Sequence, residues 1–118
     1  MTAERDSSAY LDDILGAIRN IESYTTGMTS EAFSTDMKTK DAVVRNLEVI
    51  GEAVKRIPAD IRNAYPDIEW RPAAAMRDFL IHEYPEIDAQ AVWDTIKTDL
   101  PSFKNGVERC LRDVSEGQ

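Results

Sequence analysis

The sequence predicts an all-α fold, in the form of an up-and-down bundle of four main helices with short helical turns between them. Apolar residues recur at steps of three and four over several long stretches. No segment alternates apolar and polar residues with the period of a half-buried strand. The length of 118 residues suits one domain. We expect a single domain over 1–118, with its core at about 9–112 and flexible ends.

The first half of the chain contains two predicted helices. Residues 7–25 form the first, with Ser7 or Ser8 as N-cap and Gly27 after its end. A short helical turn is expected at 30–33. The strongest apolar stripe predicts a helix over 37–57, and Pro58 stops it. Gly51 lies inside this helix and is either a point of close helix approach or simply a tolerated glycine.

Prolines divide the second half. A helical turn is expected at 60–64, followed by a helix over 73–83 with Pro72 at its first position and Pro85 after its end. Its predicted core residues are Met76, Phe79 and Leu80, and Trp70 and Trp93 are expected to anchor the core or an interface. Asp88 is the expected N-cap of a last helix that runs to 111 and is kinked or broken at Pro101.

The net charge of −8 argues against a generic polybasic binder of nucleic acid or membrane. The charge is uneven: residues 1–36 and 78–118 each carry −5, whereas residues 37–56 carry +2 and residues 57–77 carry zero. Acidic outer helices that keep the protein soluble explain this pattern, and so does a local anion-binding surface. The basic residues that such a surface could include are Lys38, Lys40, Arg45, Lys55, Arg56, Arg71 and Arg77.

Cysteine and histidine usage narrows the function further. Cys110 is the single cysteine, so no intrachain disulfide can form, and we interpret it as structural. We see neither a signal peptide nor an apolar run long enough to cross a membrane, and we expect a cytoplasmic protein. His82 is the single histidine, which excludes a multi-histidine metal centre within one chain. No metal or other cofactor is expected.

The stretch 77–84 has the strongest potential for chemistry. On a helical wheel, Arg77, Asp78 and His82 lie off the core stripe. Asp78 precedes His82 by four residues, so its carboxylate can hydrogen-bond the imidazole, and both this carboxylate and the helix end favour an imidazolium. Spacing alone also fits a capping histidine beside an ordinary aspartate. Ile81, on the exposed side, indicates a contact with another protein.

Arg77 and His82 are about 140° apart on the wheel. They converge only through the long arginine side chain, a distorted helix end or a second chain. A reaction with two proton transfers needs two acid–base groups, and one chain offers one histidine. A two-fold dimer would supply a second His82 and a second Arg77.

The same stretch carries a resemblance to a known family. Residues 76–84, the following Pro-Glu-Ile-Asp, Val92-Trp93 and Leu100-Pro101 together resemble the HepT-like branch of the HEPN superfamily. The helix segment 44–53 resembles the second signature of that branch. Arg77, His82 and Tyr84 satisfy its R-x4-H-x-Y motif, and Asp78 fits the polar position after the arginine.

The resemblance implies a HEPN-like bundle that acts as a metal-independent endoribonuclease toxin. Arg77 and His82 would be catalytic at a homodimer interface, Asp78 would support them, and Arg45 would help to bind RNA. The implied partner is an MntA-like nucleotidyltransferase antitoxin that adenylylates Tyr84. The alternative function is a non-catalytic HEPN module that binds a nucleotide or a nucleotidyltransferase.

Overall fold

The computed structural model describes residues 6–83 and 86–116, and these residues confirm the all-α prediction. No strand occurs in these two segments. No helix in them is long and apolar enough to span a membrane. The helices are α1 (Ser7–Thr25), α2 (Ser30–Thr35), α3 (Met37–Arg56), α4 (Ala59–Ala64), α5 (Trp70–Glu83), α6 (Ala89–Asp94), the π-helical segment η1 (Thr95–Asp99) and α7 (Leu100–Glu116).

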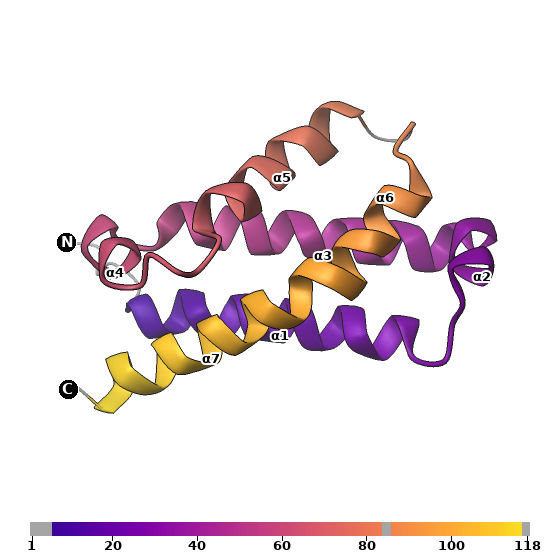
Figure 1. Ribbon diagram of the computed structural model, residues 1–118. Coiled ribbons are helices and arrows are strands. Elements are labelled where there is room, and N and C mark those ends of the chain that lie inside the picture. The colour runs from indigo at the N-terminus through magenta and orange to yellow at the C-terminus, as the bar shows by residue number, and fades with distance from the viewer. Residues whose placement is uncertain (1–5, 84–85, 117–118) are drawn as a thin grey trace.

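The long helices alternate in direction, as an up-and-down bundle requires. Figure 1 shows α1 and α3 side by side and antiparallel, with the short helix α2 at the end where the chain turns back. Helix α5 lies along α3, and α7 packs against α1. The C-terminal half of α5 therefore lies at the edge of the bundle, with α3 as its main neighbour.

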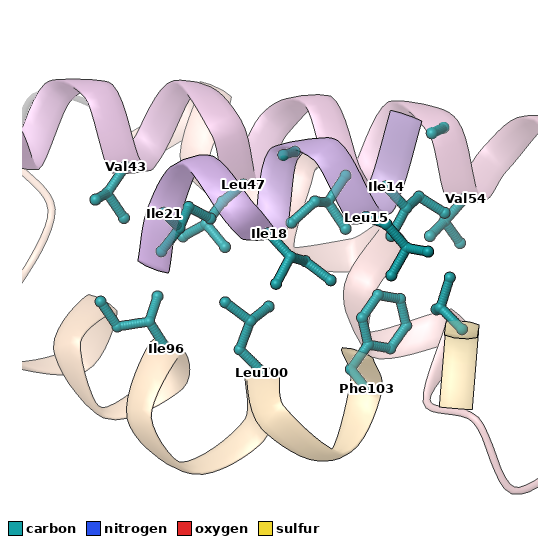
Figure 2. Packing of buried hydrophobic residues seen from close by; sticks show 14 of the residues in the cluster. Ile14, Leu15, Ile18, Ile21, Val43, Leu47, Val54, Ile96, Leu100 and Phe103 are labelled. Atoms are coloured by element: carbon teal, nitrogen blue, oxygen red, sulfur yellow. The ribbon is translucent and has the colours of Figure 1, made fainter. Parts of the chain in front are cut away.

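The core lies between α1, α3 and the continuous path from η1 into α7. Ile14, Ile18 and Ile21 of α1 point toward Leu47 and Val54 of α3 in Figure 2, and Leu100 and Phe103 close the core from the other side. All these side chains are buried. The apolar stripes at helical spacing therefore mark the buried faces of these two helices correctly.

Side-chain caps define several helix starts. Asp88 caps α6 as expected, because its side chain accepts a hydrogen bond from Gln90 N at 2.9 Å. The predicted cap of the first helix is wrong by one or two residues, because Asp6 accepts from Ser8 N at 3.2 Å. Helix α5 begins at Trp70, so Pro72 is its third residue and not its first. The N–H groups of the first turn have no intrahelical acceptor, so proline fits there too.

The last predicted helix is interrupted just before Pro101. The chain forms five π-helical residues, Thr95–Asp99, and returns to α-helix at Leu100. A proline in a helix donates no hydrogen bond and crowds the carbonyl of the residue four positions earlier. The wider π turn gives that carbonyl room, so the helix keeps its course through Pro101.

The predicted core face of α5 is partly wrong. Leu80 is fully buried and Met76 is partly buried, but 54% of Phe79 is exposed. Helix α5 packs chiefly on α3, so its contact stripe is narrower than that of a helix between two neighbours. The expected exposure of Ile81 is confirmed, since 46% of this residue is exposed, and its contact with another protein stays a prediction.

Cys110 is fully buried in α7, and burial, helped by the charge of Asp113, raises the pKa of its thiol to about 11. A raised pKa keeps the sulfur as the unreactive thiol at neutral pH. We expect an alkylating reagent to modify Cys110 much more slowly in the native protein than in denaturant. Mass spectrometry of timed samples measures both rates, and equal rates would contradict a structural role in the core.

Candidate functional site

Arg77 sits where α3 and α5 come closest together. A Cβ atom built on Gly51 of α3 would overlap Arg77 Cβ and lie 3.0 Å from the carbonyl oxygen of Ala73. Only glycine leaves room for the two helices at this distance. Of the two explanations that the sequence left open for Gly51, the close helix approach is therefore confirmed.

Arg77 belongs to a continuous chain of ion pairs that joins α3 to α5. Arg77 Nε lies 3.2 Å from Glu52 Oε2, and Arg77 Nη1 lies 3.2 Å from Asp78 Oδ1. Arg56 Nη2 donates to the second oxygen of Glu52 at 3.2 Å, and Lys55 Nζ donates to Asp78 Oδ1 at 2.7 Å. We call these residues (Lys55, Asp78, Arg77, Glu52 and Arg56) the ion-pair chain. It carries three positive and two negative charges, a net charge of +1.

Exposed ion pairs of this kind contribute little to stability, typically less than about 1 kcal/mol each. The side chains of Asp78 and Glu52 are 52% and 44% exposed. The ion-pair chain therefore matters more for where it holds the head groups than for the free energy of unfolding. The hydrogen bonds from Lys55 and then from Arg77 lower the pKa of Asp78, so its carboxylate stays charged well into the acidic range.

The expected hydrogen bond from the His82 imidazole to the Asp78 carboxylate is absent from the described segments. Asp78 Oδ1 accepts from Lys55 and Arg77 instead. The helical spacing of four residues allowed the imidazole contact, but the cations of α3 and of the preceding residue compete for the same carboxylate. Asp78 therefore supports Arg77 directly, whereas its expected support of His82 has no counterpart in the single chain.

A groove of about 490 Å³ runs between α1, α3 and α5, beside the ion-pair chain. It brings together Arg45 and Arg77, which are 32 positions apart in sequence, and Ile81 lies on its wall. Tyr10 and Asp13 of α1 complete the opposite side. Arg45, the residue expected to help with RNA, thus faces the same groove as Arg77.

His82 lies in the last turn of α5 and is exposed. It is not among the residues that line the groove, and no hydrogen bond joins it to Arg77 within residues 6–83 and 86–116. Helix α5 is helical up to Glu83, so no distorted end brings the two together, and the Arg77 guanidinium pairs with Glu52 and Asp78. Convergence through a second chain stays a prediction. Tyr84 lies outside the described residues.

From the sequence, Lys55 is only one of seven basic residues that an anion-binding surface could include, and Glu52 is not expected in the site. Glu52 pairs with Arg77 across the helix contact as well as with Arg56 on its own helix. The available signal was Gly51, because residues next to a point of close approach face the partner helix. No group of three His, Cys, Asp or Glu side chains in the described segments is arranged to hold a metal ion.

Comparison with known proteins assigns this sequence to a family. Residues 14–110 match the family described as "Ribonuclease HepT-like". The chain belongs to the HepT-like ribonuclease family. The match spans α3 and α5, and so includes every residue of the ion-pair chain as well as His82. The resemblance found in the R-x4-H-x-Y motif is thereby confirmed at the level of the family.

Two archaeal proteins illustrate how closely other HepT-like chains match this one. "Probable ribonuclease HepT" of Thermococcus cleftensis is 46% identical over 106 residues, which cover 90% of this chain and 96% of that protein. "Putative RNase MJ0125" of Methanocaldococcus jannaschii is 45% identical over 113 residues, which cover 96% and 97%. No solved structure matched the chain. Family and relatives together support a ribonuclease.

Proposed function

We propose that this chain is the ribonuclease toxin of a toxin–antitoxin system and cleaves RNA without a metal ion, at a site that two copies of the chain build together. The observation that carries the proposal is that no hydrogen bond joins Arg77 to His82 in the described residues. Arg77 pairs with Glu52 and Asp78 at the α3–α5 contact, and His82 is exposed at the end of α5. A second copy would bring the two motif residues of this HepT-like chain together.

A two-fold arrangement of the α5 ends would supply each group that the chemistry needs. One His82 takes the proton from the RNA 2′-hydroxyl, whose oxygen attacks the adjacent phosphorus. The bond from phosphorus to the 5′ oxygen breaks, and the second His82 donates a proton to that leaving oxygen. Arg77 stabilises the negative charge that builds on the phosphoryl oxygens, which its planar fork matches in geometry.

One exposed apolar side chain beside the proposed site is consistent with the pairing of two copies. Ile81 lines the groove beside Arg77 and is 46% exposed, whereas Phe79 lies about 160° away around the helix and forms no patch with it. In a two-fold interface the Ile81 surface of each subunit would meet its partner, so one surface serves both subunits.

Tyr84 follows His82 by two residues and is the proposed regulatory position. An MntA-like nucleotidyltransferase antitoxin would transfer AMP from ATP to the phenolic oxygen and release pyrophosphate. The added adenylate is bulky and negatively charged. It would block the site beside His82 and repel the phosphates of RNA, which accounts for inhibition of the toxin.

The chemical nature of the RNA ends tests the proposed reaction. In excess EDTA, the purified chain is expected to cut total cellular RNA into fragments with 2′,3′-cyclic phosphate and 5′-hydroxyl ends, because the 2′-hydroxyl is the nucleophile. Mass spectrometry identifies both ends. Fragments with 5′-phosphate ends, or cleavage that appears only with added metal, would contradict the metal-independent mechanism.

The same assay distinguishes a ribonuclease from the alternative, which is a non-catalytic module that binds a nucleotide or a nucleotidyltransferase. That alternative predicts intact RNA and saturable nucleotide binding that depends on Arg77. Intact-mass measurement after co-expression with an MntA-like nucleotidyltransferase tests the regulatory part, and a gain of one adenylate on Tyr84 is expected. The variant Tyr84→Phe should gain none.

A further inference from the structure

Lys55 reaches from the last turn of α3 across to α5. Its Nζ atom lies 2.7 Å from Asp78 Oδ1, and its side chain remains 37% exposed. Arg77 Nη1 lies 3.2 Å from the same oxygen. An ammonium and a guanidinium from two different helices therefore flank a single anionic oxygen, on the open side of the α3–α5 contact.

This arrangement needs a reason beyond stability. Two like charges that lie close together repel each other, and Asp78 offsets this repulsion while an exposed pair adds little to the free energy of unfolding. The two cations direct N–H donors at one acceptor. A phosphate oxygen is the same kind of acceptor, so an RNA phosphate can take the position that Asp78 Oδ1 holds in the free chain.

The other basic side chains of α3 do not share this position. Arg56 pairs with Glu52, and Arg45 lies about three turns before Lys55 along the helix. Lys38 lies near the opposite end of α3, about 25 Å from Lys55 along the axis. Arg56 and Arg77 pair with different oxygens of Glu52, whereas Lys55 is the α3 cation, within the described residues, that shares a single oxygen with Arg77.

We propose that Lys55 is a second RNA-binding cation of the site: it contacts a phosphate beside Arg77, and Asp78 is the positioning residue that holds the two cations together in the free protein. This inference rests on the proposed ribonuclease function. It adds to the catalytic pair a residue from a different helix, and it explains why Asp78 is directed toward α3 and not toward His82.

A purely structural role for Lys55 makes a different prediction. If Lys55 only ties α5 to α3 through Asp78, then Lys55→Gln and Asp78→Asn break the same bond and should act alike. If Lys55 contacts phosphate, Lys55→Gln removes a contact to RNA, whereas Asp78→Asn keeps both cationic side chains and loses only the carboxylate charge that positions them. The salt dependence of RNA binding separates the two roles, because each lost phosphate contact lowers its slope by about 0.7 for a single strand.

The experiment measures binding of a short mixed-sequence, fluorescein-labelled single-stranded RNA over a range of salt concentrations, in the His82→Ala background so that the RNA stays intact. Lys55→Gln should lower the slope by about 0.7, and Lys55→Arg and Asp78→Asn should keep it. Lys38→Gln is the matched control on the same helix, with an unchanged slope. In the active chain, Lys55→Gln should reduce RNA cleavage about tenfold, as expected for one lost charge-assisted hydrogen bond.

Two results would overturn the proposal for Lys55. In the first, Lys55→Gln leaves the salt-dependence slope of RNA binding unchanged. In the second, Lys55→Gln and Asp78→Asn lose the same affinity without a change of slope. Thermal melting of each variant shows that the compared proteins are folded. The RNA cleavage assay distinguishes failure of this inference from failure of the proposed ribonuclease function. Cleavage that depends on His82, together with an unchanged Lys55→Gln slope, refutes only this inference, whereas intact RNA with the unmodified chain refutes the proposed function as well.

Discussion

Replacing His82 by alanine is expected to reduce RNA cleavage by about 10²- to 10⁴-fold, the range that general acid–base groups contribute. In the proposed dimer the change removes both proton-transfer groups at once, because each subunit supplies the one histidine of its chain. The side chain is exposed in the last turn of α5, so its loss should leave the fold intact. Initial rates on labelled RNA in EDTA measure the effect.

The neighbouring Glu83 provides a matched control. It is exposed in the same helical turn, and it has no part in the proposed chemistry. Glu83→Gln should cleave RNA at close to the unmodified rate, and both variants should melt near the same temperature as the unmodified chain. If His82→Ala retains full cleavage, His82 has no catalytic role and the proposed mechanism is wrong.

Replacing Gly51 by alanine should impair the protein through a single added methyl group. The new Cβ would overlap Arg77 Cβ and press on the backbone oxygen of Ala73, and neither atom can move without α5. Overpacking of this kind costs about 1–3 kcal/mol of stability. Because the displaced side chain is Arg77 itself, we also expect cleavage by the folded fraction to fall at least tenfold. Denaturant unfolding and RNA cleavage rates measure the two effects.

The other helical glycines separate damage to the site from damage to the fold. A Cβ on Gly16 meets nothing within 4 Å, so Gly16→Ala should stabilise α1 by about 0.5–1 kcal/mol. A Cβ on Gly106 would lie 2.8 Å from the Ile68 side chain, and neither residue belongs to the ion-pair chain or lines the groove beside it. Gly106→Ala should therefore destabilise the fold without changing RNA cleavage by the folded protein. Full cleavage in Gly51→Ala would show that the α3–α5 contact does not position Arg77.

Much of the fold follows from local sequence features. Continuous apolar stripes locate α1 and α3, and Pro58 and Asp88 mark boundaries that the structure keeps. Phe79 shows the limit of this reasoning, because a helical wheel gives the direction of a side chain but not the presence of a neighbour to cover it. The same limit applies at Pro101, where the sequence predicts a disturbance but not that a π turn absorbs it.

The candidate site, like the fold, is predicted by the sequence only in part. The motif spacing identifies Arg77 and His82, because both belong to one helix and a family resemblance rests on them. Lys55 and Glu52 come from α3, and their partnership with α5 depends on the close helix contact at Gly51. The hydrogen-bond partner of Asp78 illustrates the difference, since spacing along the helix favoured His82 and packing between helices selected Lys55.

The −8 charge at first counts against RNA as a substrate, and the ion-pair chain shows how the two are compatible. Its three cations and two carboxylates sum to +1, and with Arg45, Asp13 and Glu48 of the adjoining groove the region is neutral in a protein whose net charge is −8. We expect RNA affinity to depend on a few phosphate contacts in this region, and hence a modest salt dependence.

The central claim is that two copies of the chain build one site, and mixing active with inactive subunits tests it most directly. Unmodified and His82→Ala chains are co-refolded in varying proportions, and cleavage of RNA in EDTA is measured. If both histidines are needed in one cleft, activity falls with the square of the unmodified fraction, to about one quarter at equal amounts. Activity in direct proportion to the unmodified fraction, about one half at equal amounts, would show that each subunit works alone and would contradict the shared site.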